Sequence, residues 1–487
     1  MNFDEPTLVR NPSTPKGYKG LAGFHKYWGK KPIEAWGFLI ETLTQEKEII
    51  LDPFLGSGLI AKECIDFDRR FIGFDINPFS IELTKVYLNP PDYLKLRQAL
   101  DDIEKLVKPD IDSLYLTSKG EIVTHFLWEK DKITKVWTKH SGKRVEIVLS
   151  NKELADFECV ANHEISIGRK LNLFDNSRIN SKNAMSFNDL FTYRALMAIS
   201  HLIHSFDPYE DRVNRALKLI LTASLGQMSK MVFAVTNRGK TKELETENIE
   251  VGSWVIGYWR PEQHFEINAW NCFENKANRL LKALKSGNGY YVTDITNSFQ
   301  GFYDSKAQSY LRVGDSEVLL SEIPDETVKL ILTDPPHGDR IPYLELSEMW
   351  NAILDLDVNF ENELVVSNAK GRNKNLDEYN SKLSSIFSEC NRVLEPDGLL
   401  AIMFNARSCE HWDSLHALEA VTGLEYIGCY PMEYSAGSVV QDNRKGSLKS
   451  DYVLLYGKQV TNLYKKKIMK VFNLIDGWMI EYPKNGK

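Results

Sequence analysis

The segment Asp52-Pro53-Phe54-Leu55-Gly56-Ser57-Gly58 decides the fold that this sequence predicts. It follows the apolar run 48–52 and opens a helix-like stretch to about residue 67, after which the run 70–75 returns as a second strand. A strand, a glycine-rich turn, a helix and a further strand make a βαβ unit. The sequence therefore predicts an α/β domain in which this turn lies at the carboxyl edge of a parallel sheet.

A second segment, Thr333-Asp334-Pro335-Pro336-His337, also follows an apolar strand-like run. Further strand-like runs occur at 310–314, 399–404, 424–430 and 451–456, and helical spacing occurs at about 342–355, 376–394 and 411–421. In between, residues 112–168 predict a small antiparallel β element, and 189–233 and 266–284 have helical spacing. We expect one doubly wound α/β domain, formed by residues 1–91 and 301–487 and interrupted by a mixed α+β insertion at 92–300.

Composition restricts the class of protein. The 487 residues are 43% hydrophobic and 26% charged, as is usual for a globular chain of two or three domains. The formal net charge is -7, so a polyanion such as nucleic acid would have to meet local basic patches. Candidate patches lie around Lys26, Lys30 and Lys31, at 238–242 and at 370–374.

The six cysteines are scattered and contain no CxxC pair, which argues against a zinc ribbon and against a disulfide framework. The chain starts without a signal-peptide pattern, and it contains no run of about 18 apolar residues. We therefore expect a cytoplasmic protein with no metal site and no membrane segment.

The first segment is suited to a nucleotide-like ligand. Gly56 and Gly58 allow backbone N–H groups at a helix start to approach a ligand closely. Asp75 ends the next strand, where an acid accepts hydrogen bonds from ribose hydroxyls. No GK[ST] follows these glycines and GxGxxG is absent, and Asp52 would repel a pyrophosphate but tolerate a cationic sulfonium or ammonium. The alternative is a purely structural connection between strand and helix.

The second segment is suited to an exocyclic amine of a nucleic-acid base. Asp334 can accept one N–H hydrogen bond and the carbonyl of Pro335 the other, while Pro335 and Pro336 limit backbone freedom. A flat ring from His337 or Tyr343 could stack on a base swung out of a duplex. Methyl transfer would then be a direct in-line displacement that depends on positioning. The alternative is a plain turn after a buried strand; cytosine C5 chemistry is disfavoured because no Pro-Cys dipeptide exists.

Together the two segments resemble the motifs of the amino-methylating DNA methyltransferases, which act on adenine N6 or cytosine N4. The resemblance extends to the segments at 25–32 (HKYWGKKP), 71–78 (FIGFDINP), 312–316 (RVGDS) and 391–398 (NRVLEPDG). It implies a Rossmann-like S-adenosylmethionine-dependent methyltransferase fold, with cofactor motifs first, a target-recognition insertion next and the catalytic motif last.

More narrowly, segments 25–32, 258–261, 265–268 and 341–347 resemble adenine-specific methylases that often carry a zinc ribbon. This chain departs from that group twice. Residues 112–168 retain only Cys159, so any ribbon there has lost its metal, and His337 replaces the usual tyrosine after Asp-Pro-Pro.

The resemblance implies roles for individual residues. The catalytic set is Asp334, Pro335, Pro336 and His337, and the cofactor-binding set is Trp28, Lys31, Asp52, Phe54, Gly56, Gly58, Asp75, Asn77 and Asp315. The implied activity is S-adenosylmethionine-dependent methylation of double-stranded DNA, at adenine N6 in preference to cytosine N4, in a restriction-modification or defence system. A cognate restriction endonuclease is a candidate partner.

Two rival interpretations stay open. Asp-Pro-Pro followed by an aromatic also occurs in RNA methyltransferases that act on guanine N2, but no RNA-binding module is visible near the N-terminus. A catalytically silent DNA-binding subunit that keeps the fold is the other rival, and His337 is the residue that motivates it.

Overall fold

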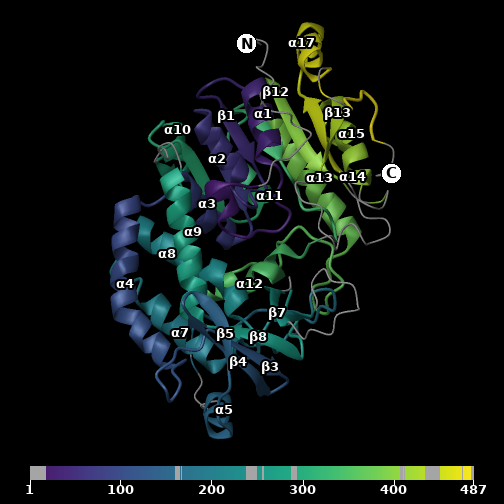
Figure 1. Cartoon of the computed structure of the whole chain (residues 1–487). Coiled ribbons are helices and arrows are strands. Elements are labelled where there is room, and N and C mark those ends of the chain that lie inside the picture. Colours follow the sequence, from purple (N-terminus) through teal and green to yellow (C-terminus); the bar gives the residue numbers. More distant parts are fainter. Residues whose placement is uncertain are drawn as a thin grey trace.

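The computed structural model describes residues 18–159, 165, 167–236, 249–254, 257–286, 293–339, 341–405, 410, 412–433, 450–473, 475 and 477–483. These residues form a larger, mostly parallel sheet and a smaller antiparallel sheet (Figure 1). Among them, no helix has the length and apolarity needed to cross a membrane.

The larger sheet has eight strands in the order β13-β14-β12-β11-β1-β2-β10-β9. The strands are β1 (Ile49–Asp52), β2 (Arg70–Asp75), β9 (Ile295–Thr296), β10 (Ser309–Val313), β11 (Val328–Thr333), β12 (Leu394–Phe404), β13 (Glu425–Glu433) and β14 (Ser450–Gly457). The predicted α/β sheet is confirmed. It is mixed and not fully parallel, because β14 runs opposite to the other strands. From the centre, β2, β10 and β9 extend one way and β11, β12, β14 and β13 the other, which puts the switch in strand order between β1 and β11.

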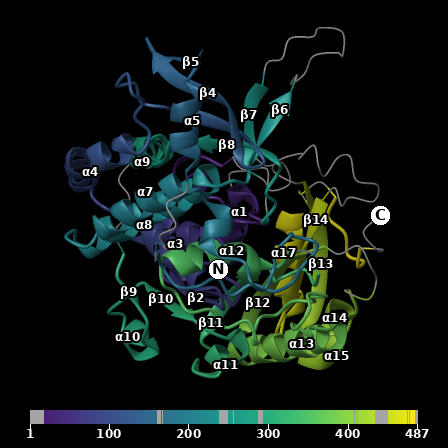
Figure 2. The same ribbon diagram turned by 90° about the horizontal axis from the view of Figure 1, so that it is seen from below.

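Helices cover both faces of this sheet, as expected for a doubly wound fold. Successive residues of β1 point to opposite faces: Ile50 joins the core that contains helices α1 (Ile33–Leu43), α2 (Leu59–Asp66) and α3 (Pro78–Leu88). Leu51 joins the core on the other face, with α11 (Ser316–Leu320), α13 (Leu376–Val393), α14 (Asp413–His416) and α15 (Leu418–Thr422). Figure 2 shows α13, α14 and α15 together on one side of the sheet. Because helices cover both faces in the described part of the chain, a ligand would approach this sheet at the ends of its strands.

The smaller sheet lies between β2 and β9 in the chain and has the order β5-β4-β3-β8-β6-β7. Its strands are β3 (His125–Glu129), β4 (Lys132–His140), β5 (Lys143–Ile147), β6 (Val232–Thr236), β7 (Ile249–Trp254) and β8 (Gln263–Ile267). Helices α4 (Tyr93–Ser113), α5 (Asn151–Glu158), α6 (Phe187–Leu190), α7 (Tyr193–His204), α8 (Asp211–Met228) and α9 (Ala269–Ser286) accompany it. At the end of this region, β9 already pairs with β10, so the larger sheet resumes a few residues before position 301.

Parts of this region differ from what the sequence predicted. Half of the sheet comes from β6, β7 and β8, outside the stretch 112–168, and α4 was not predicted. The stretch predicted as a helix from residue 266 begins in β8, and α9 starts only at Ala269. The reason is that β8 buries the polar side chains of His264 and Glu266, so it lacks the apolar alternation of an ordinary half-buried strand.

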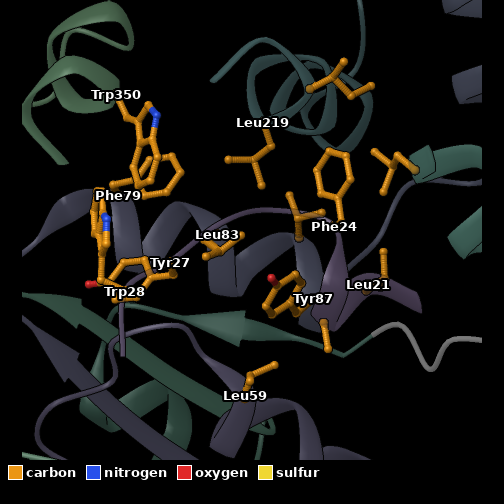
Figure 3. Close-up of a cluster of buried hydrophobic side chains, with 14 of the residues drawn as sticks. Leu21, Phe24, Tyr27, Trp28, Leu59, Phe79, Leu83, Tyr87, Leu219 and Trp350 are labelled. Carbon is orange, nitrogen blue, oxygen red and sulfur yellow. The ribbon is translucent and has the colours of Figure 1, made fainter. Parts of the chain in front are cut away.

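The helices of this region share one core with the larger sheet. Figure 3 shows Leu219 of α8 close to Phe24 of the N-terminal segment and to Leu83 of α3. The smaller sheet is therefore attached through a continuous apolar interior, which holds it in a fixed position beside the carboxyl edge of the larger sheet.

Candidate functional site

The two segments singled out in the sequence meet at the switch in strand order. β1 and β11 are parallel neighbours, with Leu51 paired to Ile331, so Asp52 at the end of β1 and Asp334 just after β11 lie at the same edge. An open pocket lies there, with about 900 Å³ of empty space that includes open solvent. Predicted residues that line it are Trp28, Lys31, Asp52, Phe54, Gly56, Asp75, Asn77, Asp315, Asp334 and Pro336. Gly58, Pro335 and His337 are not among its lining residues.

Asp52 is a buried carboxylate with one satisfied oxygen. Its Oδ1 accepts hydrogen bonds from the Thr333 hydroxyl at 2.7 Å and from the backbone N–H of Phe54 at 3.0 Å. Its Oδ2 is buried and has no hydrogen-bond partner among the described residues. Burial raises the pKa of Asp52 to about 7, and the nearby carboxylates of Asp334 and Asp75 push it in the same direction. A cationic group in the pocket would oppose this rise in pKa by stabilising the ionised carboxylate.

The glycine turn is built around Asp75. Gly56 has φ +52° and donates its N–H to Oδ2 of Asp75 at 2.6 Å. The N–H of Asn77 donates to Oδ1 of Asp75 at 2.8 Å, and burial raises the pKa of this carboxyl to about 6. Gly58, at φ +73°, opens α2, and a Cβ there would lie 2.1 Å from Oγ1 of Thr84. Gly58 is therefore required for the close packing of α2 on α3, whereas Gly56 faces the pocket.

Asn77 lines the pocket, but its side chain is fully engaged by the protein. Its amide nitrogen donates to Ser347 at 2.9 Å and to the Tyr27 hydroxyl at 3.3 Å. Its oxygen accepts from the side chain of Asn351 at 3.0 Å and from the N–H of Phe79 at 3.2 Å. These four bonds use the whole capacity of an amide side chain. Asn77 therefore ties α3 to α12 (Tyr343–Ile353), and the prediction that it binds cofactor receives no support from its side chain.

Aromatic rings form one wall of the pocket. Trp28 stacks on Trp350 of α12 with ring centroids 4.6 Å apart, and Figure 3 shows this pair beside Phe79. Tyr27 and Tyr343, both of which line the pocket, stack with centroids 6.2 Å apart. Two flat side chains are thus available to a planar ligand at this wall.

The segment after β11 is held in one conformation. Oδ1 of Asp334 lies 3.0 Å from Nε2 of His337 and 3.4 Å from Nζ of Lys31. The carbonyl of Pro336 accepts hydrogen bonds from the Tyr379 hydroxyl and from the N–H of Gly338. The His337 ring is buried 4.8 Å from the ring of Phe404 and outside the pocket lining. Of the two rings considered for stacking, His337 is therefore turned toward Asp334, whereas Tyr343 lies in the pocket.

Two ion pairs were missed by sequence reasoning. Lys31, predicted to bind cofactor, donates to the fully buried Asp451 of β14 at 2.5 Å. Asp315 caps α11 and accepts from Lys382 of α13, also at 2.5 Å. Asp451 and Lys382 belong to no recognisable motif, and Asp451 lies 420 positions from Lys31, so only the tertiary structure could identify them.

The predicted basic patches are only partly available for polyanions. Lys30 is half-buried and donates to the carbonyls of His25 and Ala22, and desolvation of its ammonium lowers its pKa to about 7. Arg372 is buried against Glu363. Lys26 lies 4.3 Å over the ring of Trp254, and residues 238–242 fall outside the described residues. Within the described part of the chain, no group of three or more His, Cys, Asp or Glu residues is arranged to hold a metal ion.

Comparison with known proteins places these observations in context. A family model for DNA methylases, N6_N4_Mtase, matches residues 7–86. Type II methyltransferase M.MjaII from Methanocaldococcus jannaschii is 21% identical over 411 residues, which are 80% of this chain and 72% of that protein. M.HindIII from Haemophilus influenzae is 34% identical over 77 residues, which are 16% of this chain and 22% of that protein.

A solved structure of the PvuII DNA methyltransferase, described as cytosine-N4-specific, aligns over 30% of this chain and 47% of its own. Its sequence identity is 19% and its TM-score 0.21. Residues 7–86 are thus similar to a DNA-methylase family model, and most of the chain is similar to a Type II methyltransferase.

Proposed function

We propose that this protein transfers a methyl group from S-adenosylmethionine to an exocyclic amine of a base in double-stranded DNA, with adenine N6 as the target. The observation that carries the proposal is the convergence of Asp52 and Asp334 on one pocket at the switch in strand order, where open α/β sheets bind ligands. The names of the Type II methyltransferase relatives support a restriction-modification setting. A cognate endonuclease is the partner that we propose for this setting. Adenine is favoured because segments 25–32 and 341–347 resemble adenine-specific methylases.

The pocket fits S-adenosylmethionine. The buried Oδ2 of Asp52 lacks a partner among the described residues, and the pocket is lined by several carboxylates, which suits a cationic sulfonium. Asp75 is the last residue of β2, a position where an acid accepts hydrogen bonds from ribose hydroxyls. We assign Asp52, Phe54, Gly56, Asp75 and Asp315 to the cofactor, with Trp28 as part of the wall. When bound, S-adenosylmethionine supplies a methyl group activated by the positive sulfur.

The residues after β11 would act on the target base. A base amine is a weak nucleophile because its lone pair is delocalised into the ring. Asp334 accepts a hydrogen bond from this amine, and the carbonyl of Pro335 accepts the second. The two bonds localise the nitrogen lone pair and aim it at the methyl group. Asp334 also provides an acceptor oxygen for the proton that the nitrogen must lose. Tyr343 stacks on the extruded base, and the buried His337 positions Asp334 instead of stacking.

We further propose that the region 92–300 selects the DNA sequence. It is attached to α12, the helix that follows the catalytic segment. Arg169 pairs with Glu348 through Nη1 and Nη2 of its guanidinium, and the Tyr258 hydroxyl donates to the carbonyl of Glu345 at 2.5 Å. Such a connection would hold a DNA-reading surface in register with the catalytic pocket.

Sequencing tests this proposal directly. DNA from a methylation-free host that expresses the protein is analysed by single-molecule sequencing with modification detection, beside an Asp334→Ala variant. We expect modified adenines within one short motif in the wild type and none in the variant. Modified cytosines would keep the mechanism and change the target. An unmodified genome from a folded protein would contradict the proposal and favour RNA methylation or a silent DNA-binding subunit. Binding of S-adenosylmethionine without turnover would favour the silent subunit in particular.

A further inference from the structure

Lys31 lies between two carboxylates that come from opposite ends of the chain. Its Nζ atom is 2.5 Å from Oδ2 of Asp451 and 3.4 Å from Oδ1 of Asp334. The Asp451 side chain is fully buried, and the Lys31 side chain is only 8% exposed. Lys31 immediately precedes α1, whereas Asp451 lies on β14, the one strand of the larger sheet that runs antiparallel to its neighbours. The ammonium group is therefore fixed in place from two sides.

Burial makes this arrangement unlike a surface ion pair. A lysine on the surface moves among many rotamers, and its charge is screened by water. Here the ammonium is desolvated, so the short contact with Asp451 determines where its positive charge lies. Lys31 lines the pocket beside Asp334. It does not take part in the hydrogen bonds that Asp75 accepts from Gly56 and Asn77. This placement argues for an action of Lys31 on the carboxylate that receives the target amine.

We propose that Asp451 is a positioning residue for methyl transfer, which holds the Lys31 ammonium against Oδ1 of Asp334 and so keeps this carboxylate correctly oriented toward the target amine. The inference rests on the proposed function, because it gives Asp334 the role of amine acceptor. The sequence had assigned Lys31 to the cofactor, whereas this inference assigns it to the catalytic carboxylate. His337 contacts the same Oδ1 atom, so Lys31 and His337 together fix one oxygen of Asp334 and leave the other to the amine.

The groups around Asp334 explain why a nearby ammonium is needed. Asp52 ends the neighbouring strand β1, and Asp451 belongs to β14, so two further carboxylates lie close to Asp334. His337 comes from the same loop, and the buried Tyr379 hydroxyl of α13 binds the carbonyl of Pro336. Among these groups, Lys31 supplies the positive charge. Its loss would leave Asp334 beside Asp52 without the ammonium that offsets the repulsion between the two carboxylates.

The test compares the wild type with the double variant Lys31→Met/Asp451→Asn. Changing both partners avoids a buried unpaired charge, which a single substitution would leave and which could prevent folding. The matched control is Lys329→Met/Asp397→Asn, which removes another ion pair with a buried lysine. Lys329 lies near the start of β11, at the far end of the strand from Asp334. Thermal unfolding establishes that all three proteins are folded.

Two quantities are measured on each protein. The first is the dissociation constant of S-adenosylmethionine, by calorimetry. The second is the single-turnover rate of DNA methylation at saturating cofactor and DNA. We expect the Lys31/Asp451 variant to bind the cofactor within about threefold of wild type and to react at least about tenfold more slowly at pH 7. The control variant keeps the wild-type rate.

The outcomes separate this inference from the proposed function. No methylation by the wild-type protein would overturn the proposed function, and this inference with it. An active wild type whose rate is unchanged in the Lys31/Asp451 variant would overturn the inference alone. A loss of cofactor affinity that accounts for the whole loss of rate would also overturn it, because Lys31 would then be a cofactor ligand. Partial recovery of the rate in Lys31→Arg, which retains the charge, would support it.

Discussion

Replacement of Asp52 by asparagine should stabilise the ligand-free protein at alkaline pH while weakening cofactor binding. In the folded protein burial raises the pKa of Asp52 from an ordinary 3.8 to about 7. The folded state therefore keeps a proton on this carboxyl at pH values where the unfolded chain has lost it. Stability of the wild type is lost as pH rises from about 4 to about 7. Asparagine cannot ionise, and its oxygen can still accept from Thr333 and Phe54.

The magnitude follows from the shift in pKa. A rise of about three units corresponds to roughly 4 kcal/mol of destabilisation once pH exceeds both values. Between pH 5 and pH 8 the linkage relation gives a change of roughly 3 kcal/mol in the difference between variant and wild type. For a chain of 487 residues the unfolding entropy is about 1 kcal/mol/K, so the difference in Tm should grow by about 3 °C.

The assay is thermal unfolding of both proteins without cofactor at pH 5, 6, 7 and 8. The control is Asp68→Asn, which changes an exposed carboxylate in a surface pair with Lys47 and should show no such trend. In parallel, calorimetry at pH 8 should show S-adenosylmethionine bound at least about tenfold more weakly by the Asp52 variant, because the sulfonium loses a nearby negative charge. A Tm difference that stays constant with pH, or one that falls, would refute the reasoning about Asp52.

Two further predictions concern packing around the site. Gly58→Ala should lower Tm more than Gly120→Ala. Both glycines have positive φ, but only at Gly58 would the new Cβ clash with Thr84 Oγ1, at 2.1 Å. Equal losses of Tm in thermal unfolding would show that the clash is relieved by movement. Arg169→Met should be less stable than Arg169→Met/Glu348→Met by about 2 kcal/mol or more, because the single change leaves the buried Glu348 carboxylate unpaired. Denaturant unfolding measures this difference, and a single variant as stable as the double one would contradict it.

The sequence alone was most informative where local pattern and function coincide. β1, β2 and β11 were predicted because each is a short apolar run that ends in a glycine- or proline-rich turn. The helices α12 and α13 were found to within a few residues because their apolar periodicity is regular. Since parallel strands end at one edge, the same pattern predicted that Asp52 and Asp334 would meet.

Local pattern failed where burial involves polar groups. β8 hides Glu266 against Arg194, so its sequence does not alternate like that of a half-buried strand. Asn77 was assigned to the cofactor because segment 71–78 resembles a family motif, and the sequence did not reveal that its side chain makes four hydrogen bonds within the protein. The direction of the His337 ring was equally invisible, because the adjacent carboxylate of Asp334 and the ring of Phe404 determine it.

The sequence by itself determined the α/β architecture and the pair of carboxylates, Asp52 and Asp334, at one edge of the sheet. These properties depend on hydrophobic periodicity and turn residues, which act over a few neighbouring positions. Only the tertiary structure decided the partners of those carboxylates, above all the contact of Lys31 with Asp451 across 420 positions. Such a contact arises because strand order brings distant segments together and because a buried charge must find an opposite one, and no local pattern encodes either condition.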